Sequence, residues 1–334
     1  MDFLKDIVKE IGDDYTQLAS DISDSEQFID TGSLVFNGLV SGSIFGGVSS
    51  NKITAIAGES STGKTFFALA VAKNFLDTNP DAYVLYFDTE SSITRSLLES
   101  RNIDMKRFVV INVVTIEEFR TKALKAIDIY LKTDIHDRKP CMFVLDSLGM
   151  LSTEKEIRDA LDDKQVRDMT KSQLVKGAFR MLTLKLGQAN VPLIVTNHTY
   201  DVIGAYVPTK EMGGGSGLKY AASTIIYLGK KKEKDGKEVI GNIIKAKTHK
   251  SRLSKENKQV DIRLYYDQRG LDKYYGLLEL GEIGGLWKNV AGRYEIGGKK
   301  VYAKQIYSKP EEYFTDDVLQ ALDEISQKEF SYGS

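Results

Sequence analysis

One segment constrains the possible folds of this chain more than any other, the glycine-containing run Gly58-Glu-Ser-Ser-Thr-Gly63-Lys64-Thr65. The short apolar run of residues 52–57 before it predicts a buried strand, and the apolar spacing of residues 66–76 after it predicts a helix. Glycines in such a loop let backbone N–H groups turn inward around phosphate oxygens, and the N-terminus of the following helix favours negative charge. Strand, loop and helix in this order predict a site for a nucleoside triphosphate.

The last two residues of the loop carry the expected chemistry. Lys64 is expected to reach the β- and γ-phosphates of the nucleotide, and the Thr65 hydroxyl is expected to bind Mg²⁺. The complete set of residues expected to bind the nucleotide is Gly58, Glu59, Ser60, Ser61, Thr62, Gly63, Lys64, Thr65 and Phe66.

Carboxylates that follow two other apolar runs are candidates for the rest of the site. Asp146 ends the strand-like run 141–145, where a second ligand for the metal ion is expected beside the phosphate loop. An aspartate in this position more often caps a helix or a turn, so the assignment depends on the loop. Glu90 follows the strand-like run 83–88 and is placed to hold and deprotonate an attacking water molecule, with Asp88 in support.

Strand-like and helical runs alternate along most of the chain, which predicts an α/β fold with a mostly parallel, twisted sheet covered by helices on both faces. We expect strands at 52–57, 83–88, 108–114, 141–146, 192–197, 223–228, 239–247 and 260–266, and helices at 2–18, 66–76, 96–104, 116–132, 172–186 and 315–326. Residues 20–32 read as a linker, 152–171 as a charged stretch and 199–217 as a polar, glycine-rich loop. The expected units are an N-terminal helix with its linker (1–30), the core (31–268) and a small C-terminal α+β domain (269–334).

Charge and composition limit the kinds of partner and the cellular location that we expect for this chain. The 46 basic and 47 acidic residues nearly balance, but residues 1–30 contain nine acidic against two basic residues, and residues 229–258 contain eleven basic against four acidic ones. This polarity suggests a polyanionic partner or head-to-tail contact between subunits, although two solvated faces would give the same pattern. The single cysteine excludes an intramolecular disulfide, and no uncharged run approaches the roughly 20 apolar residues of a membrane helix. The first residues also lack the basic start and apolar core of a secretory signal, so we expect a cytoplasmic protein.

Several motifs in a fixed order resemble the RecA family of recombinases, and within it the phage, UvsX-like branch. After the phosphate loop these are Phe87-Asp-Thr-Glu90, Val144-Leu-Asp-Ser-Leu148, Thr196-Asn-His198 and Met212-Gly-Gly-Gly-Ser-Gly217. The resemblance covers about residues 30–290. It implies a RecA-like core, and an ATPase that forms helical filaments on single-stranded DNA and pairs it with a homologous duplex in recombination, repair and replication.

The resemblance also implies roles for particular residues. Glu90 corresponds to the catalytic glutamate, Asp146 with Ser147 to the metal-binding pair, and His198 to the residue that senses the γ-phosphate. Lys250 and Arg252 correspond to a basic pair that reaches the triphosphate of a neighbouring subunit, onto which the N-terminal helix docks. The implied DNA-binding residues are Tyr200, Tyr206, Gly213, Gly214, Gly215 and Lys219. The implied partners are single- and double-stranded DNA, further copies of the chain, a single-strand-binding protein and a loading mediator, in the cytoplasm of a phage-infected bacterium.

Other interpretations stay open at this point. A ring-forming motor such as a helicase, or a mediator that binds ATP and DNA to load another recombinase, would share the phosphate loop. His198 could be an ordinary structural histidine, and Lys250 and Arg252 part of a solvated basic face. Leu97 stands where bacterial members of the family have a tyrosine near the adenine, so the selectivity for the base is also open.

Overall fold

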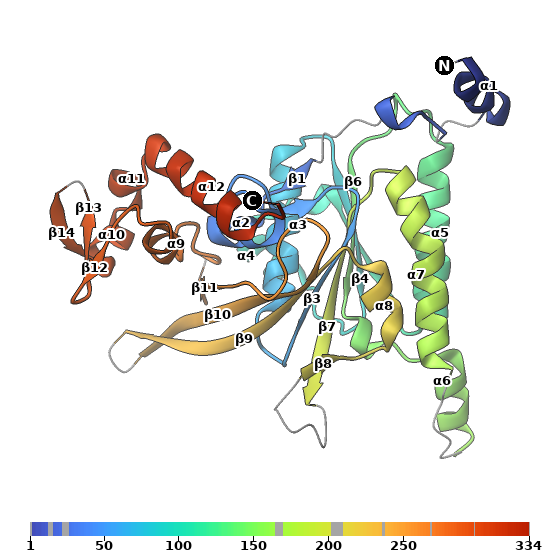
Figure 1. Ribbon diagram of the computed structural model, residues 1–334. Coiled ribbons are helices and arrows are strands. Elements are labelled where there is room, and N and C mark those ends of the chain that lie inside the picture. Colours follow the sequence, from blue (N-terminus) through green and yellow to red (C-terminus); the bar gives the residue numbers. More distant parts are fainter. Residues whose placement is uncertain are drawn as a thin grey trace.

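The computed structural model of this 334-residue protein describes residues 2–12, 16–21, 27–163, 170–201, 210–235, 238–267, 269–296 and 298–333. Within these residues the central element is a nine-stranded sheet with the order β11-β10-β9-β3-β7-β6-β4-β5, in which β8 pairs with β7 (Figure 1). Strands β9, β3, β7, β6, β4 and β5 run parallel, and β10 and β11 are antiparallel additions. The strands are β3 (Ile53–Gly58), β4 (Tyr83–Asp88), β5 (Phe108–Asn112), β6 (Cys141–Asp146), β7 (Leu193–Asp201), β8 (Lys210–Met212), β9 (Thr224–Asp235), β10 (Glu238–Ser251) and β11 (Gln259–Tyr265).

Helices cover both faces of this sheet, as the sequence predicts (Figure 1). Because side chains alternate along a strand, Val144 of β6 packs into one core and Leu145 into the other. The first face carries α2 (Leu34–Ser41), α3 (Lys64–Thr78), α4 (Arg95–Ser100) and α12 (Asp316–Phe330), and the second carries α5 (Ile116–Lys132), α7 (Lys171–Gln188) and α8 (Ser216–Ala221). None of the helices in the described part of the chain is long and apolar enough to cross a bilayer.

The register of the parallel strands places the candidate site at one edge of the sheet. Gly58 at the end of β3 lies opposite His198 on β7, and Asp88 at the end of β4 lies opposite Asp146 on β6. The carboxyl ends of parallel strands are the usual place for ligands in such sheets. The motifs that are far apart in the sequence therefore meet along this edge.

The N-terminal region differs from its prediction. Helix α1 spans only Asp2–Ile11, because the chain turns at Gly12 with a positive φ of 62°. The expected linker contains β1 (Phe28–Ile29), which pairs with β2 (Val48–Ser49). Helix α2 was not predicted, because it is buried on nearly every side and so lacks a polar stripe that would reveal its helical period.

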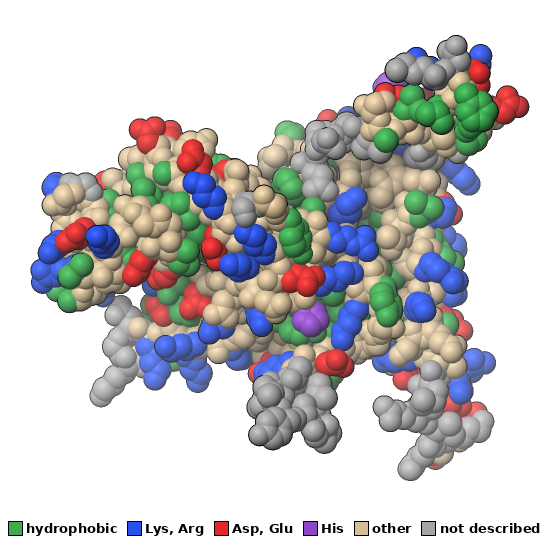
Figure 2. Space-filling view, in the orientation of Figure 1, with side chains coloured by type: hydrophobic (Ala, Val, Ile, Leu, Met, Phe, Trp, Pro, Cys, Tyr) green, Lys and Arg blue, Asp and Glu red, His purple; other side chains and the backbone are tan. Residues whose placement is uncertain are grey.

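Strands β9 and β10 form a hairpin that extends well beyond the predicted 223–228 and 239–247. Many lysines lie along it, three of them consecutive in β9, and this charge hides the strand pattern. Figure 2 shows lysine and arginine side chains gathered under the hairpin. The exposed lysines of this basic hairpin are Lys230, Lys231, Lys232, Lys234, Lys245 and Lys247.

Two other segments contain elements that the sequence did not reveal. The charged stretch after residue 152 forms α6 (Glu154–Leu161), whose start is fixed by reciprocal hydrogen bonds between Thr153 and Glu156. The expected loop 199–217 is partly ordered, because β7 continues to Asp201, β8 pairs with it, and α8 begins at Ser216. Short 3₁₀ turns lie at Ala19–Asp21, Met105–Arg107 and Leu148–Met150.

The C-terminal segment is built from a small sheet and short helices. It contains α9 (Leu277–Ile283), β12 (Asn289–Val290), β13 (Arg293–Ile296), β14 (Lys299–Tyr302), α10 (Ala303–Ser308), α11 (Pro310–Tyr313) and α12. Helix α12 returns to the core: Asp323 accepts hydrogen bonds from the Ser43 hydroxyl (2.7 Å) and the Ile44 N–H (2.8 Å), and the Ser326 hydroxyl donates to the carbonyl of Gly42 (2.8 Å). The C-terminal segment therefore shares a core with α2, and the boundary at residue 268 remains a prediction.

Candidate nucleotide-binding and catalytic site

The phosphate loop connects β3 to α3 through backbone conformations that its sequence permits. Gly63 has φ 88°, which glycine adopts without strain, and Ser61 has φ 59°, which is uncommon for a residue with a side chain. A Cβ atom at Gly58 would lie only 2.8 Å from the carbonyl oxygen of Leu228 on β9. The loop is therefore held close to β9, and its first glycine is needed for that approach.

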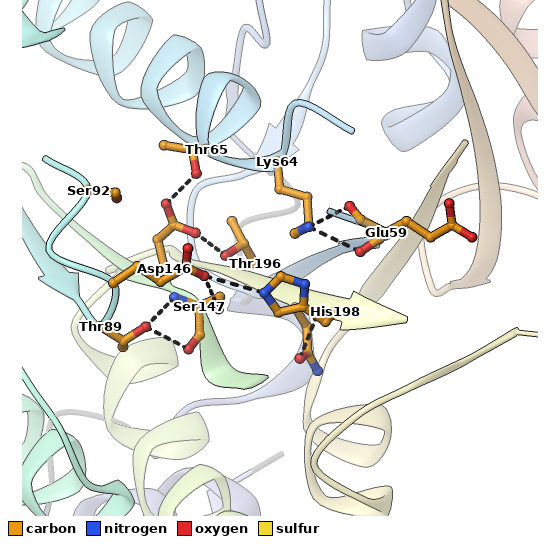
Figure 3. A network of polar contacts seen from close by, with 12 residues as sticks. Glu59, Lys64, Thr65, Thr89, Ser92, Asp146, Ser147, Thr196 and His198 are labelled. Carbon is orange, nitrogen blue, oxygen red and sulfur yellow. Dashed lines mark hydrogen bonds and ion pairs between the residues drawn. The ribbon is translucent and has the colours of Figure 1, made fainter. Parts of the chain in front are cut away.

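Lys64 is buried in the loop, with 7% of its surface exposed. Its ammonium group donates to the carbonyl oxygens of Gly58 (3.1 Å) and Glu59 (2.8 Å) (Figure 3). Burial lowers the pKa of Lys64, and the nearby carboxylates of Asp146 and Glu90 oppose this effect. A phosphate anion in the loop would supply the charge that this buried cation lacks.

Asp146 is the acceptor for hydroxyl groups from three elements. Its Oδ2 accepts from Thr65 at 2.7 Å, and its Oδ1 accepts from Thr196 (Figure 3). The same Oδ2 also accepts from the Tyr86 hydroxyl at 2.6 Å. Burial and the Asp146 carboxylate raise the pKa of Tyr86, so this phenol stays a hydrogen-bond donor. Mg²⁺ prefers oxygen ligands of the kind that Asp146 and Thr65 bring together here, so the residues present fit the expected metal ion.

Glu90 lies within reach of two side chains from neighbouring strands. Its Oε1 accepts a hydrogen bond from the Ser147 hydroxyl at 2.9 Å, and Nε2 of His198 lies 3.3 Å from the same oxygen. Thr89 fixes Ser147 by hydrogen bonds with both backbone groups of that residue, at 2.8 and 3.0 Å. The structure thus brings Glu90, Ser147 and His198 together beside the phosphate loop.

Asp88 holds the turn that carries Glu90. Its carboxylate accepts backbone hydrogen bonds from Glu90 (3.1 Å), Ser92 (3.3 Å) and Ile93 (3.0 Å). These bonds fold the chain after β4 and aim Glu90 at the loop. The expected supporting role of Asp88 therefore has a structural basis in this turn.

The phosphate loop opens into a cleft of about 370 Å³. Ser60, Lys64, Thr65, Glu90, Asp146 and His198 line it together with residues that the sequence did not single out, namely Lys230, Lys232, Asn242, Leu264, Tyr265 and Tyr266. The hydroxyl of Tyr266 donates to Asn242 at 3.2 Å. No sequence motif marks these additional residues. They reach the cleft because β9 pairs with β3, and β10 and β11 follow beside β9 in the sheet.

Lys250 and Arg252 lie elsewhere in the same chain. The Lys250 ammonium donates to the carbonyl oxygens of Lys219 (2.6 Å), Tyr220 (3.3 Å) and Ala222 (2.7 Å) at the C-terminal end of α8. Arg252 lines a separate cavity of about 740 Å³ between α7 and α8. Neither residue lines the cleft of its own subunit.

The described residues expected to bind DNA lie near the end of β7, and Tyr206 lies outside the described residues. Tyr200 is exposed and is paired with Glu211 on β8, and Gly213 packs so closely against Tyr200 that a Cβ atom would lie 2.9 Å from the ring. Gly213 is also tied to the site, because its N–H donates to the carbonyl of His198 (3.0 Å) and its carbonyl accepts from Asn197 (2.8 Å). A Cβ atom at Gly214 would lie 3.4 Å from Leu148 and one at Gly215 would lie 2.6 Å from Ser172, and Lys219 lies 3.4 Å from Glu211.

Comparison with known proteins agrees with this arrangement. A family model described as the RecA N-terminal domain matches residues 2–272. The recombination and repair protein of Enterobacteria phage T4 is 34% identical over 261 residues, which cover 78% of this chain and 65% of the phage protein. Protein RecA of Thermus aquaticus is 25% identical over 334 residues, covering 96% of this chain and 94% of that protein. Protein RecA of Francisella tularensis subsp. novicida is 28% identical over 289 residues, covering 84% of this chain and 76% of that protein.

The predicted resemblance is therefore confirmed at the level of both the sequence and the fold. The parallel sheet, the phosphate loop at the end of β3 and the residues around Glu90 all lie within the matched range. Identity to the phage protein exceeds identity to either of these bacterial proteins. The chain belongs to the RecA family.

Proposed function

We propose that this protein is an ATP-dependent DNA recombinase, which forms helical filaments on single-stranded DNA and catalyses homologous pairing and strand exchange. Membership of the RecA family supports this proposal. The observation that carries it is the convergence of Lys64, Thr65, Glu90, Asp146 and His198 around one cleft. A protein that only binds ATP would have no need for Glu90 in that position.

The proposed reaction is hydrolysis of the γ-phosphate of ATP. The loop N–H groups and Lys64 bind the phosphates, and Glu90 orients a water molecule and accepts its proton. Thr65 and Asp146 would hold Mg²⁺, which neutralises charge on the phosphate oxygens when bound. Ser147 and His198 keep the Glu90 carboxylate turned toward the loop through the contacts at 2.9 and 3.3 Å.

His198 is proposed to transmit the state of the nucleotide to the DNA-binding segment. A γ-phosphate beside Glu90 would change the contact between His198 and that carboxylate. The backbone of His198 is hydrogen-bonded to Gly213 at 3.0 Å, and Gly213 packs against Tyr200. Tyr200 and Lys219 offer stacking and charge to single-stranded DNA, with Tyr206, Gly214 and Gly215 in the same proposed segment.

Assembly is proposed to complete the site. Lys250 and Arg252, which lie away from their own cleft, would stabilise charge on the triphosphate of a neighbouring subunit. Helix α1 exposes Phe3, Leu4 and Ile11, which fits docking onto another subunit better than packing on its own core. We place the protein in the cytoplasm of a phage-infected bacterium, with a single-strand-binding protein and a loading mediator as further partners.

The test is the ATPase rate of the full chain with and without single-stranded DNA, together with electron microscopy of the same samples. We expect stimulation by DNA that weakens as salt rises, because phosphate contacts release counterions. We also expect extended helical filaments. Closed rings would favour a helicase-like motor, and DNA binding without hydrolysis would favour a loading mediator; either result would overturn the proposal.

A further inference from the structure

Lys230 on β9 contacts the tip of the phosphate loop. Its ammonium group donates to the carbonyl oxygen of Ser60 at 3.2 Å and to that of Ser61 at 3.1 Å. Lys64 donates to the two preceding carbonyls, those of Gly58 and Glu59. Two ammonium groups therefore hold four consecutive carbonyl oxygens of the loop, and only Lys64 belongs to the sequence motif.

These carbonyl contacts bear on how the loop binds phosphate. A phosphate loop works because its N–H groups point inward, which requires its carbonyl groups to point away from the anion. Ser61 must adopt a left-handed conformation, with φ 59°, to make this turn. Lys230 holds the carbonyl of that strained residue and of the one before it, and so favours the binding conformation.

The pattern along β9 separates Lys230 from its neighbours. Successive side chains of a strand point to opposite faces, and Lys230 and Lys232 line the cleft whereas Lys231 does not. The side chain of Lys232 forms no hydrogen bond or ion pair with the described residues, so it contributes only its charge to the cleft. Of the three adjacent lysines, Lys230 therefore lines the cleft and binds the loop, Lys232 only lines the cleft, and Lys231 does neither.

We propose that Lys230 is a positioning residue that preorganises the phosphate loop for nucleotide binding. This proposal rests on the proposed nucleotide-binding function. When a nucleotide binds, Lys64 turns to the phosphates, and Lys230 remains on the carbonyls of Ser60 and Ser61. Because the loop surrounds the phosphates common to ADP and ATP, loss of Lys230 lowers the affinity for both nucleotides by the same factor.

The experiment measures the dissociation constants of Mg²⁺ complexes of fluorescent ADP and of a non-hydrolysable fluorescent ATP analogue. It uses the full chain without DNA, at low and at high salt. We expect Lys230→Met to weaken both ligands about tenfold at both salt concentrations, because the two contacts, at 3.2 and 3.1 Å, are much shorter than the Debye length of about 8–10 Å. Lys230→Arg should restore most of the affinity, since a guanidinium also donates to carbonyls.

Two neighbouring substitutions serve as controls. Lys231→Met should bind both nucleotides like the parent chain. Lys232→Met removes an equal charge from the cleft without removing a hydrogen bond, so its effect should be about twofold and should disappear at high salt.

The outcomes separate this proposal from its alternatives. A loss with Lys230→Met that is confined to the ATP analogue would make Lys230 a direct ligand of the γ-phosphate and would overturn the positioning role. A loss no larger than that of Lys232→Met would also overturn it. If the parent chain binds neither nucleotide, the proposed function itself fails, whereas unchanged binding by Lys230→Met removes only the role of Lys230.

Discussion

The hydroxyl of Thr65 donates to the carboxylate of Asp146 at 2.7 Å, although 81 residues separate the two in the sequence. Thr65 is fixed at the start of α3, and Asp146 is fixed at the end of β6 by hydroxyl groups from β4 and β7. The pair therefore offers rigid oxygen ligands for a metal ion beside the phosphate loop.

Asp146→Asn is expected to remove the dependence of nucleotide binding on Mg²⁺ and to lower the ATPase rate by about 100-fold or more. Asparagine also presents an N–H group to hydroxyls that now donate to a carboxylate, so the free energy of unfolding should fall by about 1–3 kcal/mol. Magnesium titrations and urea unfolding measure the two effects. Asp128→Asn, at a partly exposed pair with Lys185 away from the cleft, is the control. Unchanged magnesium dependence would remove Asp146 from the metal site.

Glu90→Gln is expected to retain nucleotide binding while the turnover number falls by about 10²–10⁴-fold, because glutamine cannot accept the proton of the attacking water. Single-turnover hydrolysis and nucleotide titration separate the two quantities. The exposed Glu99, which is paired with Arg95, provides the matched control Glu99→Gln. Full turnover by the Glu90 variant would contradict its assignment as the base.

Lys64→Met is expected to abolish hydrolysis without lowering the stability of the nucleotide-free protein. Burial lowers the pKa of Lys64, which means that the folded protein holds its charged form at a cost in free energy. Removing the charge offsets the loss of the two carbonyl contacts, and the urea midpoint should stay the same or rise. A clear drop in the midpoint would show that Lys64 contributes net stability to the folded chain.

Mixing two inactive variants tests whether Arg252 acts on a neighbouring subunit. Arg252→Ala leaves Glu90 intact, and Glu90→Gln leaves Arg252 intact, so a mixed filament contains some complete sites. In a random equimolar mixture, about a quarter of the heterologous interfaces would combine both intact residues, and DNA-stimulated hydrolysis should reappear at that level. No recovery, with filaments still visible by electron microscopy, would place the action of Arg252 within its own subunit.

His249 should make stability depend on pH. Its ring stacks on that of Tyr227, with 4.4 Å between the ring centroids. Burial lowers the pKa of His249 below the ordinary 6.5. The positive charges of Lys219 and Lys247 lower this pKa further, whereas the negative charges of Glu256 and Glu211 raise it. The unfolded chain therefore binds more protons, and stability falls as pH drops from 6.5 toward the lowered pKa of the folded state.

The His249 effect is measured as the urea midpoint at several pH values between 5 and 8. His249→Gln should flatten the slope below pH 6.5, while His136→Gln, at an exposed position, should keep it. An unchanged slope in the His249 variant would contradict the prediction.

The residues proposed for catalysis could be placed near one another from the sequence because they follow from local patterns. The phosphate loop has its own spacing, and Glu90, Asp146 and His198 each lie at or just after the end of an apolar strand. Parallel strands bring those ends to one edge without further information. The register of the sheet then sets their distances, which the sequence alone does not contain.

Other features depend on contacts between distant elements. Tyr86 and Thr196 reach Asp146 only because β4, β6 and β7 are adjacent in the sheet. Lys230 reaches the phosphate loop only because β9 pairs with β3. Helix α2 could not be predicted from its sequence, because a helix buried on nearly all sides has no amphipathic period.

The contacts of Lys250 link assembly to the geometry of α8. An ammonium group has three hydrogens to donate, and Lys250 already faces three carbonyl oxygens of the α8 end. To grip a phosphate in an adjoining molecule, it must release at least one of them. If Lys250 acts across the subunit boundary as proposed, each such release would loosen α8, the helix that follows Gly213–Gly215, and would couple filament assembly to a rearrangement of the segment proposed to bind DNA.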